Sequence, residues 1–207
     1  MGPSAAKTRH ETPTVCDVIA IAASAGGLAA LSAVLSEFKP DLPAAVLVVQ
    51  HMDPQHPSHL AEIMGRRVSL QVKQATQHEK IKPGTVYFAV PNRHLLLNPD
   101  GRLSLAAAPP IHFVRPAADL LFGSVAKSSG ARSMVVILSG SGTDGAEGAT
   151  AVKEAGGTVI VQDEETAEFF SMPRAAIETG SVDQVLPLHD IAAAVVRFLD
   201  DLAGAPR

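Results

Sequence analysis

The stretch that decides the fold reads Val18-Ile19-Ala20-Ile21-Ala22-Ala23-Ser24-Ala25-Gly26-Gly27. A continuous apolar run rich in Val and Ile is typical of a parallel strand that is buried on both faces. Beyond Gly27 the apolar residues recur at helical spacing, and four of them would share one helix face: Leu28, Leu31, Leu35 and Phe38. The sequence therefore predicts a strand over 15–23, a sharp turn at Ser24 and a helix over 26–38.

Ser24 occupies the place that the serine has in a nucleophile elbow. In that motif the serine projects from a tight strand-to-helix turn, and the residues two before and two after it must be small. Ala22 and Gly26 meet this requirement. The same pattern is typical of a tight turn in which a serine caps the helix, so the spacing alone leaves both interpretations open.

Composition excludes several classes of function. The 207 residues are 46% hydrophobic and 18% charged, as expected for a soluble α/β protein with one full-sized core. A net charge of −4 and an aromatic content of 4% argue against nucleic-acid binding. The single cysteine excludes an internal disulfide and favours a reducing compartment. Because neither a membrane span nor a signal peptide is visible, we expect a cytoplasmic protein without membrane insertion.

Apolar strands and amphipathic helices alternate along the chain. Further strands are predicted over 44–50, 68–72, 87–90, 134–138 and 158–161, and further helices over 57–66, 116–129, about 146–154 and 191–202. Residues 95–97 and 103–105 predict a β-hairpin, and 169–174 a loop with exposed aromatic residues. This alternation predicts a single doubly wound, mostly parallel sheet flanked by helices, with an inserted antiparallel β-hairpin. We expect 1–13 to be a disordered arm and 14–207 to form one domain.

The three most apolar strands are each followed by a side chain that can do chemistry: Ser24, His51 and Asp144. If these strands are neighbours, their side chains converge outside the carboxyl edge of the sheet. His51 could then take the proton of the Ser24 hydroxyl, and Asp144 could orient the imidazole. Taken singly, each residue has a plainer explanation, since Ser24 and Asp144 could be helix caps and His51 a buried core histidine.

An oxyanion formed at this site would need preorganised N–H donors. We expect them from the backbone of Ala25, Ser141 and Gly142.

Two other functions compete with a hydrolase. The run Gly140-Ser141-Gly142-Thr143-Asp144-Gly145 matches the dinucleotide-binding pattern G-x-G-x-x-G, and Asp163 follows about 20 residues later. Against this, the Asp144 carboxylate would stand where a pyrophosphate binds. Histidines crowd 51–59 and suggest a metal site, but they lack ligand spacing, and we expect no metal.

Several blocks in order resemble the catalytic domain of chemotaxis protein-glutamate methylesterases, from Val18 to about Leu199. The blocks are Ile21-Ala22-Ala23-Ser24-Ala25-Gly26-Gly27, Gln50-His51-Met52, Pro91-Asn92-Arg93-His94-Leu95, Leu138-Ser139-Gly140-Ser141-Gly142-Thr143-Asp144-Gly145, Ala155-Gly156-Gly157 and Met172-Pro173-Arg174. The resemblance implies a serine hydrolase that removes methyl groups from glutamate γ-methyl esters of chemoreceptors and releases methanol. Some members of the family also deamidate receptor glutamines.

The resemblance carries the roles of nucleophile, base and orienting acid onto Ser24, His51 and Asp144, and it implies no metal or organic cofactor. It implies methylated chemoreceptor-type helices as partners, together with a separate receiver or methyltransferase protein. We expect Met52, Arg115 and Met172 to line the substrate site.

The chain departs from the family pattern at four positions and in its extent. The family usually has Gly at Ala22, Thr at Ala25, Met at Ser141 and His at Val114. Members usually also carry an amino-terminal receiver domain and a linker, which do not occur in this sequence, so we expect either a dissected catalytic domain or a natural stand-alone form. A non-catalytic signalling module that binds a partner helix in the same crevice therefore stays open as an alternative.

Overall fold

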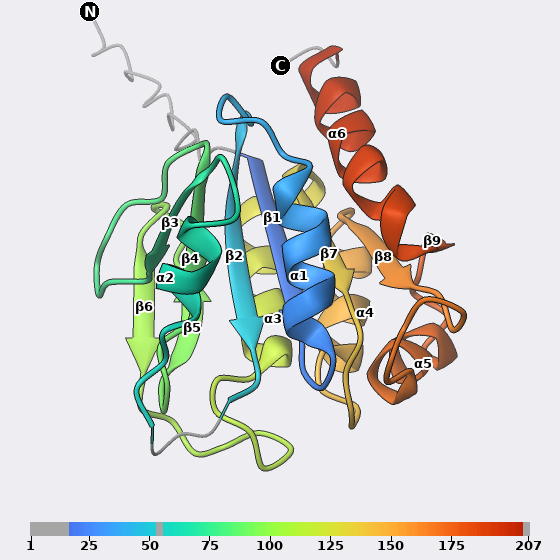
Figure 1. The fold of residues 1–207 in the computed structure, drawn as a ribbon, viewed down its shortest axis with the longest axis horizontal. Helices are drawn as coiled ribbons and strands as arrows, with labels where there is room; N and C mark the ends of the chain where they lie inside the picture. Colours follow the sequence, from blue (N-terminus) through green and yellow to red (C-terminus); the bar gives the residue numbers. More distant parts are fainter. Residues whose placement is uncertain (1–16, 53–55, 205–207) are drawn as a thin grey trace, which may run out of the picture.

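Seven strands form a parallel sheet in the computed structural model, which describes residues 17–52 and 56–204. The strand order is β3-β4-β2-β1-β7-β8-β9, with β1 at its centre, and every pair is parallel (Figure 1). The bounds are β1 (Asp17–Ala23), β2 (Ala44–Gln50), β3 (Gln71–Gln74), β4 (Thr85–Phe88), β7 (Ser133–Ile137), β8 (Thr158–Gln162) and β9 (Gln184–Leu186).

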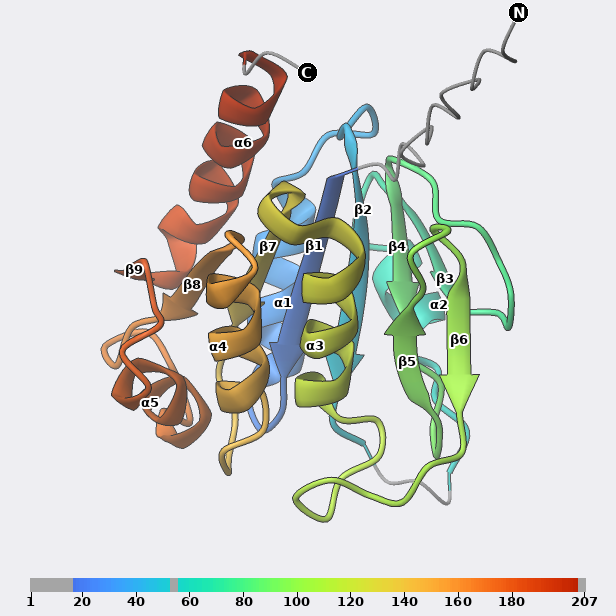
Figure 2. The same cartoon turned by 180° about the vertical axis from the view of Figure 1, so that it is seen from behind.

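Helices cover both faces of the sheet. One face carries α1 (Gly27–Ser36), α2 (Leu60–Gly65) and α6 (Leu188–Gly204), as Figure 1 shows. The other carries α3 (Ala118–Ser129), the short 3-10 turn η1 (Gly130–Arg132), α4 (Ala146–Glu154) and α5 (Ser171–Glu178) (Figure 2). The antiparallel hairpin of β5 (His94–Leu97) and β6 (Leu103–Ala106) packs beside α3 on this second face.

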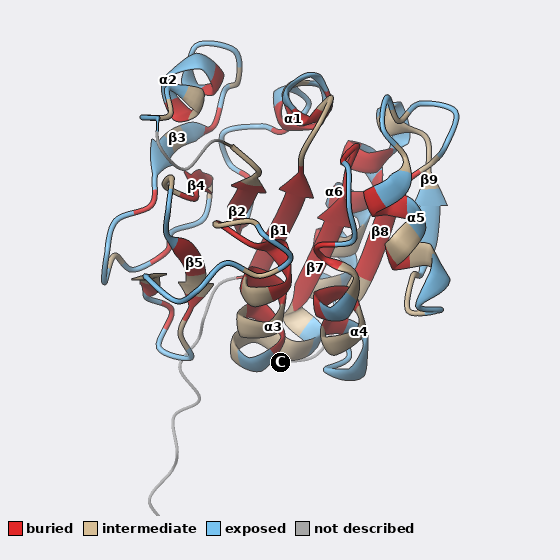
Figure 3. Ribbon diagram, turned by 90° about the horizontal axis from the view of Figure 1, so that it is seen from below, coloured by how far each residue is buried: buried red, intermediate tan, exposed pale blue. Residues whose placement is uncertain are grey.

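The central strand supplies both cores. Ala20 and Ala22 pack on the side of α3 and α4, whereas Ile19 and Ile21 pack on the side of α1 and α6. All four side chains are fully buried, which explains why the strand reads as an unbroken apolar run. Figure 3 shows the central strands β1, β2, β7 and β8 buried between the two helix layers, seen from the edge at which β1 and β2 end.

Most predicted elements are confirmed, and the differences have local causes. The predicted antiparallel hairpin is confirmed, and it forms its own two-stranded sheet beside the main one. The loop predicted over 169–174 is wrong because α5 begins at Ser171, and Pro173 is tolerated in a first helical turn. The strand β9 was not predicted, since its three residues are short and largely exposed.

The remaining differences are small. β3 lies at 71–74 where a strand over 68–72 was predicted. The expected arm over 1–13 lies outside the described residues. Within the described ranges, none of the helices combines the length and apolar character that crossing a membrane requires.

Candidate active site

The three strands with chemically active ends are direct neighbours. β1 lies between β2 and β7, with Ala23 paired to Gln50 and Ala22 paired to Ile137. Ser24, His51 and the loop that contains Asp144 therefore leave the sheet at the same edge, so the condition on which the predicted convergence rests, that these strands are neighbours, is met. Because the connections run outward in both directions from β1, this edge is also the topological switch point where α/β sheets form their crevices.

Ser24 stands in a tight turn that only glycine allows. Gly26 has φ of +71°, and a Cβ there would lie 2.8 Å from the Ser139 hydroxyl oxygen. The N–H of Gly27 donates to the Ser24 carbonyl at 2.9 Å, and the Ser24 N–H donates to the Ser139 carbonyl at 3.0 Å. The Ser24 hydroxyl makes no hydrogen bond within the described part of the chain, and α1 has no side-chain cap.

Gln50 joins the serine turn to the histidine, a role that sequence reasoning missed. Its Nε2 donates to the carbonyl oxygens of Ser24 at 2.8 Å and His51 at 3.1 Å. The His51 N–H donates to the Ala23 carbonyl at 3.0 Å, which extends the sheet pairing by one residue. The one signal available in the sequence was the position of Gln50 beside His51 in a shared block.

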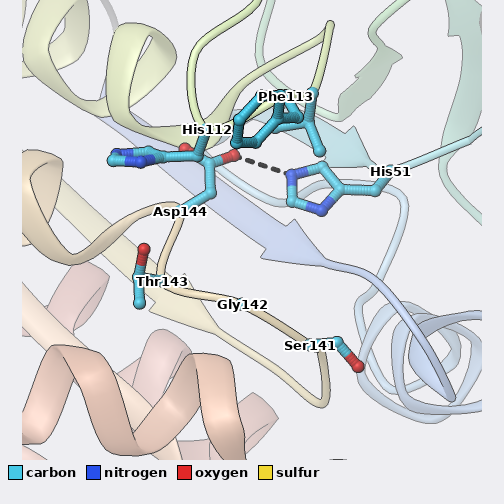
Figure 4. A pocket seen from close by; sticks show the side chains of 8 residues that line it. His51, His112, Phe113, Ser141, Gly142, Thr143 and Asp144 are labelled. Carbon is cyan, nitrogen blue, oxygen red and sulfur yellow. Dashed lines mark hydrogen bonds and ion pairs between the residues drawn. The ribbon is translucent and has the colours of Figure 1, made fainter.

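His51 and Asp144 form a buried hydrogen-bonded pair. His51 Nε2 lies 2.7 Å from Asp144 Oδ2, and the two side chains are 10% and 3% exposed (Figure 4). The other ring nitrogen, Nδ1, remains to exchange a proton with a hydroxyl. A neutral imidazole whose Nε2–H faces a carboxylate has its acceptor at Nδ1, as a general base requires.

Asp144 is held by the start of α3. Its Oδ2 accepts from the Ala118 N–H at 2.6 Å, and its Oδ1 accepts from the Asp119 N–H at 3.0 Å. Burial acts to raise the pKa of Asp144, but the His51 hydrogen bond and these two N–H donors outweigh it and hold the pKa below its ordinary value. The alternative in which Asp144 caps its own helix is wrong, because α4 has no side-chain cap.

Asp119 is a second buried acid that sequence reasoning missed. Its Oδ1 accepts from the Gly145 N–H at 2.9 Å and from the Gly148 N–H at 2.7 Å, at the start of α4. Its Oδ2 makes no hydrogen bond but lies 3.3 Å from His112 Nε2. Burial, and then the charge of Asp144, raise the pKa of Asp119 to about 6 against the opposing backbone hydrogen bonds. An acidic residue in the first turn of a helix is ordinarily explained by that helix alone, so this role could not be recognised from the sequence.

Two hollows adjoin the site. A cleft of about 250 Å³ borders the histidine and aspartate, and Figure 4 shows its walls. Its lining residues are His51, His112, Phe113, Val114, Ser141, Gly142, Thr143 and Asp144. A second hollow of about 360 Å³ borders the serine, and its lining residues are Ser24, Gly26, Gly27, Leu28, Ala29, Gln50, Arg67 and Glu168. The second hollow borders Gln50 and the first borders His51, so consecutive residues line the two hollows.

The predicted oxyanion donors belong to two loops, Ala25 to the loop after β1 and Ser141 and Gly142 to the loop after β7. The Gly142 N–H donates to the Ser171 hydroxyl at 3.2 Å, a long bond that a substrate oxygen could replace. Ser141 lines the first cleft and is exposed, as Gly142 is. Ala25 follows Ser24 directly, and its carbonyl accepts from the Ser139 hydroxyl at 2.8 Å, which fixes the orientation of this peptide.

The three predicted lining residues have different surroundings. Met52 is half-buried and borders neither hollow. The Arg115 guanidinium donates to Asn92 Oδ1 and to the Ala108 carbonyl, so it braces the loop that carries Phe113. Met172 is fully buried against Gly140 in the loop after β7. We therefore assign it a role in packing that loop and no role in lining the substrate site.

One group of side chains in the described ranges has donor types suited to a metal: His112, Asp119 and Glu147, whose ligand atoms lie within 4.8 Å of one another. The ion pair of His112 with Asp119 already accounts for this group, and we assign it no metal. The dinucleotide alternative loses its support as well. The Asp144 carboxylate, in the glycine loop where a pyrophosphate would bind, is paired with His51. Asp163 accepts hydrogen bonds from the Thr166 N–H at 3.0 Å and from the Thr166 hydroxyl at 2.6 Å.

Fold and site together define a doubly wound α/β protein with serine, histidine and aspartate side chains at one switch point. The CheB methylesterase family model matches residues 19–195. A solved structure, the CheB methylesterase catalytic domain of Thermotoga maritima, superposes with a TM-score of 0.84 at 37% identity, and covers 87% of this chain and 97% of that one. The chain belongs to the CheB methylesterase family.

Curated relatives agree with this assignment. A protein-glutamate methylesterase/protein-glutamine glutaminase of Rhizobium meliloti is 42% identical over 100% of this chain and 59% of its own length. A protein of the same name from Moorella thermoacetica is 44% identical over 88% of this chain and 44% of its own. The protein-glutamate methylesterase FrzG of Myxococcus xanthus is 38% identical over 96% of this chain and 59% of its own length. The chain thus spans about half the length of the curated relatives that it matches.

Proposed function

We propose that this chain is a serine hydrolase that cleaves glutamate γ-methyl esters on chemoreceptor-type proteins and releases methanol. The observation that carries the proposal is the 2.7 Å hydrogen bond between His51 and Asp144, at the edge where the adjacent strand ends in the Ser24 turn. Membership of the CheB methylesterase family supports the same reaction. Relatives that carry the glutaminase name support glutamine deamidation as a second reaction of the same site.

In the proposed mechanism the Ser24 hydroxyl gives its proton to His51 Nδ1 and attacks the ester carbonyl. Asp144 holds the imidazole by Nε2 and stabilises the imidazolium that forms. The developing oxyanion accepts hydrogen bonds from the backbone of Ala25, Ser141 and Gly142. The imidazolium then protonates the leaving methoxide to give methanol, and water releases the glutamate carboxylate from the acyl-serine by the same proton transfers in reverse order.

The cleft suits a side chain presented from a protein surface. It is open rather than enclosed, and its rim carries Phe113, whose side chain is fully exposed. A methyl-glutamyl side chain on a receptor helix would reach the serine from this rim while apolar residues of the helix contact the phenyl ring. We propose methylated receptor helices as partners, a separate receiver or methyltransferase protein as regulator, and the cytoplasm as the location.

The test is methanol release from methylated receptor membranes by the wild type, Ser24→Ala and Ser36→Ala. Ser36 is the control, because its hydroxyl is exposed at the far end of α1 and bonds only to the Ala33 carbonyl. We expect Ser24→Ala to lose roughly three or more orders of magnitude in rate, and Ser36→Ala to match the wild type.

Near wild-type turnover by Ser24→Ala would overturn the proposal. Should neither the wild type nor the variant release methanol, a fluorophosphonate separates the remaining explanations. Labelling of Ser24 would mean an active nucleophile that acts on a different ester, and absence of labelling would mean a non-catalytic module.

A further inference from the structure

The helices α3 and α4 exchange their capping acids. Asp144, which directly precedes the turn into α4, accepts from the first N–H groups of α3. Asp119, in the first turn of α3, accepts from N–H groups at the start of α4. Neither helix is capped by a side chain at its own N-cap position, Ala117 or Gly145. Each helix start is therefore satisfied by the other helix's acid.

This exchange closes a ring of contacts around Asp144. The Asp144 carboxylate is placed by the start of α3, and α3 is placed against α4 through Asp119. The start of α4 follows Asp144 directly in the chain. Crowding secures the same junction, because a Cβ on Gly148 would lie 2.6 Å from the Phe122 side chain and 3.0 Å from the Asp119 backbone. Removal of Asp119 would leave packing alone to hold α3 to α4, without the hydrogen bonds that fix the Gly145 and Gly148 N–H groups beside Asp144.

Burying two carboxylates side by side is unfavourable, which makes the arrangement informative. Asp119 is 8% exposed and Asp144 2% exposed, and their charges repel. A single cap per helix, from an ordinary Ser or Asn at the N-cap position, would satisfy the same N–H groups without the repulsion. Separate caps would satisfy the N–H groups but would not connect the two helices. The exchange fixes the Asp144 carboxylate relative to both helices at once.

Asp119 also reaches the wall of the cleft. Its Oδ2 lies 3.3 Å from His112 Nε2, and His112 precedes Phe113 in the loop beside His51. The titratable groups that face Asp119 are Asp144 from the β7–α4 loop, His112 from the loop before α3, and Glu147 from α4. Among these, only the contacts through Asp144 lead to His51.

We propose that Asp119 is a positioning residue that fixes the Asp144 carboxylate for its hydrogen bond to His51, by anchoring the start of α3 to the start of α4. The inference rests on the proposed function for its effect on rate, but its geometric content does not depend on turnover. Asp119 touches no reacting atom in this scheme and acts only through Asp144.

The test compares Asp119→Ala, Asp119→Asn and Asp183→Ala. Asp183 is the matched control, because it accepts a backbone N–H from Val159 at 2.9 Å and pairs with Lys153, at the opposite edge of the sheet. Two signals are followed in each protein: the downfield proton resonance of the His51 imidazole N–H, and the rate at which a fluorophosphonate labels Ser24. His51→Ala assigns the resonance.

We expect Asp119→Ala to lose or broaden the His51 resonance and to label Ser24 about 10–100-fold more slowly, since supporting residues of a site typically act on this scale. On methylated receptor the same loss should fall on kcat, with KM changed less than about twofold. Asp119→Asn keeps an acceptor oxygen for Gly145 and Gly148 and should restore most of both signals. Asp183→Ala should lower stability while both signals match the wild type.

An Asp119→Ala protein with a wild-type resonance and labelling rate would overturn the inference, as would equal losses in Asp183→Ala. If Asp119→Ala does not fold, Asp119→Glu replaces it: displacement of the oxygens by one methylene should weaken both signals, and unchanged signals would again overturn the inference. Failure of the proposed function appears differently, as a wild type whose Ser24 is not labelled, and the resonance then decides the positioning role alone.

Discussion

The turns after β1 and β7 share a backbone design but hold their key side chains in opposite states. Each runs from a buried parallel strand through a glycine N-cap with positive φ, Gly26 at 71° and Gly145 at 101°, into a helix without a side-chain cap. In the first turn the Ser24 hydroxyl makes no hydrogen bond in the described structure. In the second, Asp144 is held by His51, Ala118 and Asp119.

The difference comes from what stands opposite each turn. The start of α3 points its N–H groups at the β7 turn, whereas the β1 turn borders the hollow of about 360 Å³. A nucleophile must be able to change partners during the reaction, and an orienting acid must not. The comparison therefore teaches that long-range contacts decide whether the side chain of such a turn is held in place or left without a hydrogen bond.

The largest expected effect comes from the fixed side chain. Asp144→Asn should lower kcat by about 10⁴-fold, as loss of the orienting carboxylate does in related triads. It should also lower stability by roughly 1–3 kcal/mol, because the new amide cannot accept from Ala118 and His51 on the same side. Ser24→Ala should leave stability unchanged, since its hydroxyl has no partner. Thermal unfolding of the two variants checks the contrast, and an equal loss of stability in both would contradict it.

Gly26→Ala tests the backbone of the Ser24 turn between β1 and α1. A Cβ at Gly26 would meet Ser139 Oγ and Glu168 Oε2, both at 2.8 Å, and the residue has φ of +71°. Gly180→Ala is the control, with φ of +74° and open space around its Cβ. We expect Gly180→Ala to cost about 1–2 kcal/mol and leave activity intact, and Gly26→Ala to cost more and lose activity. Denaturant unfolding and methanol release measure both effects, and equal behaviour of the two variants would show that the crowding is unimportant.

Phe113→Ala probes the rim of the cleft beside the fixed pair. Loss of a phenyl ring that contacts substrate should raise KM for methylated receptor by about 10-fold or more, with kcat nearly unchanged. A small glutamate γ-methyl ester cannot reach the ring and should be cleaved equally by both proteins. Phe169→Ala is the control, because Phe169 is 42% exposed and lines neither hollow. A KM effect on the small ester would place Phe113 in the chemistry instead.

The smallest expected effect is a pH dependence of stability. The pKa of Asp119 is raised to about 6, so its folded form binds a proton more tightly than the unfolded chain does. Its contribution to stability is full below the unfolded pKa near 4 and is lost as pH rises through about 6. Relative to Asp119→Asn, the wild type should lose about 5–10 °C in Tm between pH 4 and 7. A Tm difference that is constant with pH would contradict the raised pKa.

The sequence predicted the parts of this molecule that depend on local pattern. The apolar runs of β1, β2 and β7 predicted buried parallel strands, and the small residues around Ser24 predicted the turn. Their adjacency was only a condition of the predicted site, and the pairing of β1 with β2 and β7 meets it. The hairpin of β5 and β6 was predicted as well, whereas β9 was not, because a short exposed edge strand leaves little local signal.

The supporting contacts of the site lay beyond the sequence for a different reason. Asp119 and Gln50 act on residues that are 25 and 26 positions away, and a capping acid or a strand-end glutamine looks ordinary in isolation. The cap predicted for Asp144 illustrates the point. The residue does satisfy a helix start, but the helix is α3 and not the one that follows it in the chain.

The measurement that tests the central claim most directly is mass spectrometry of the protein after treatment with a fluorophosphonate. The account predicts a single modification on Ser24 in the wild type, and a loss of labelling by roughly three orders of magnitude or more in His51→Ala, since the hydroxyl then has no base. Ser36→Ala should be labelled like the wild type. Modification elsewhere, or undiminished labelling of Ser24 without His51, would contradict the assignment of Ser24, His51 and Asp144 as one catalytic unit.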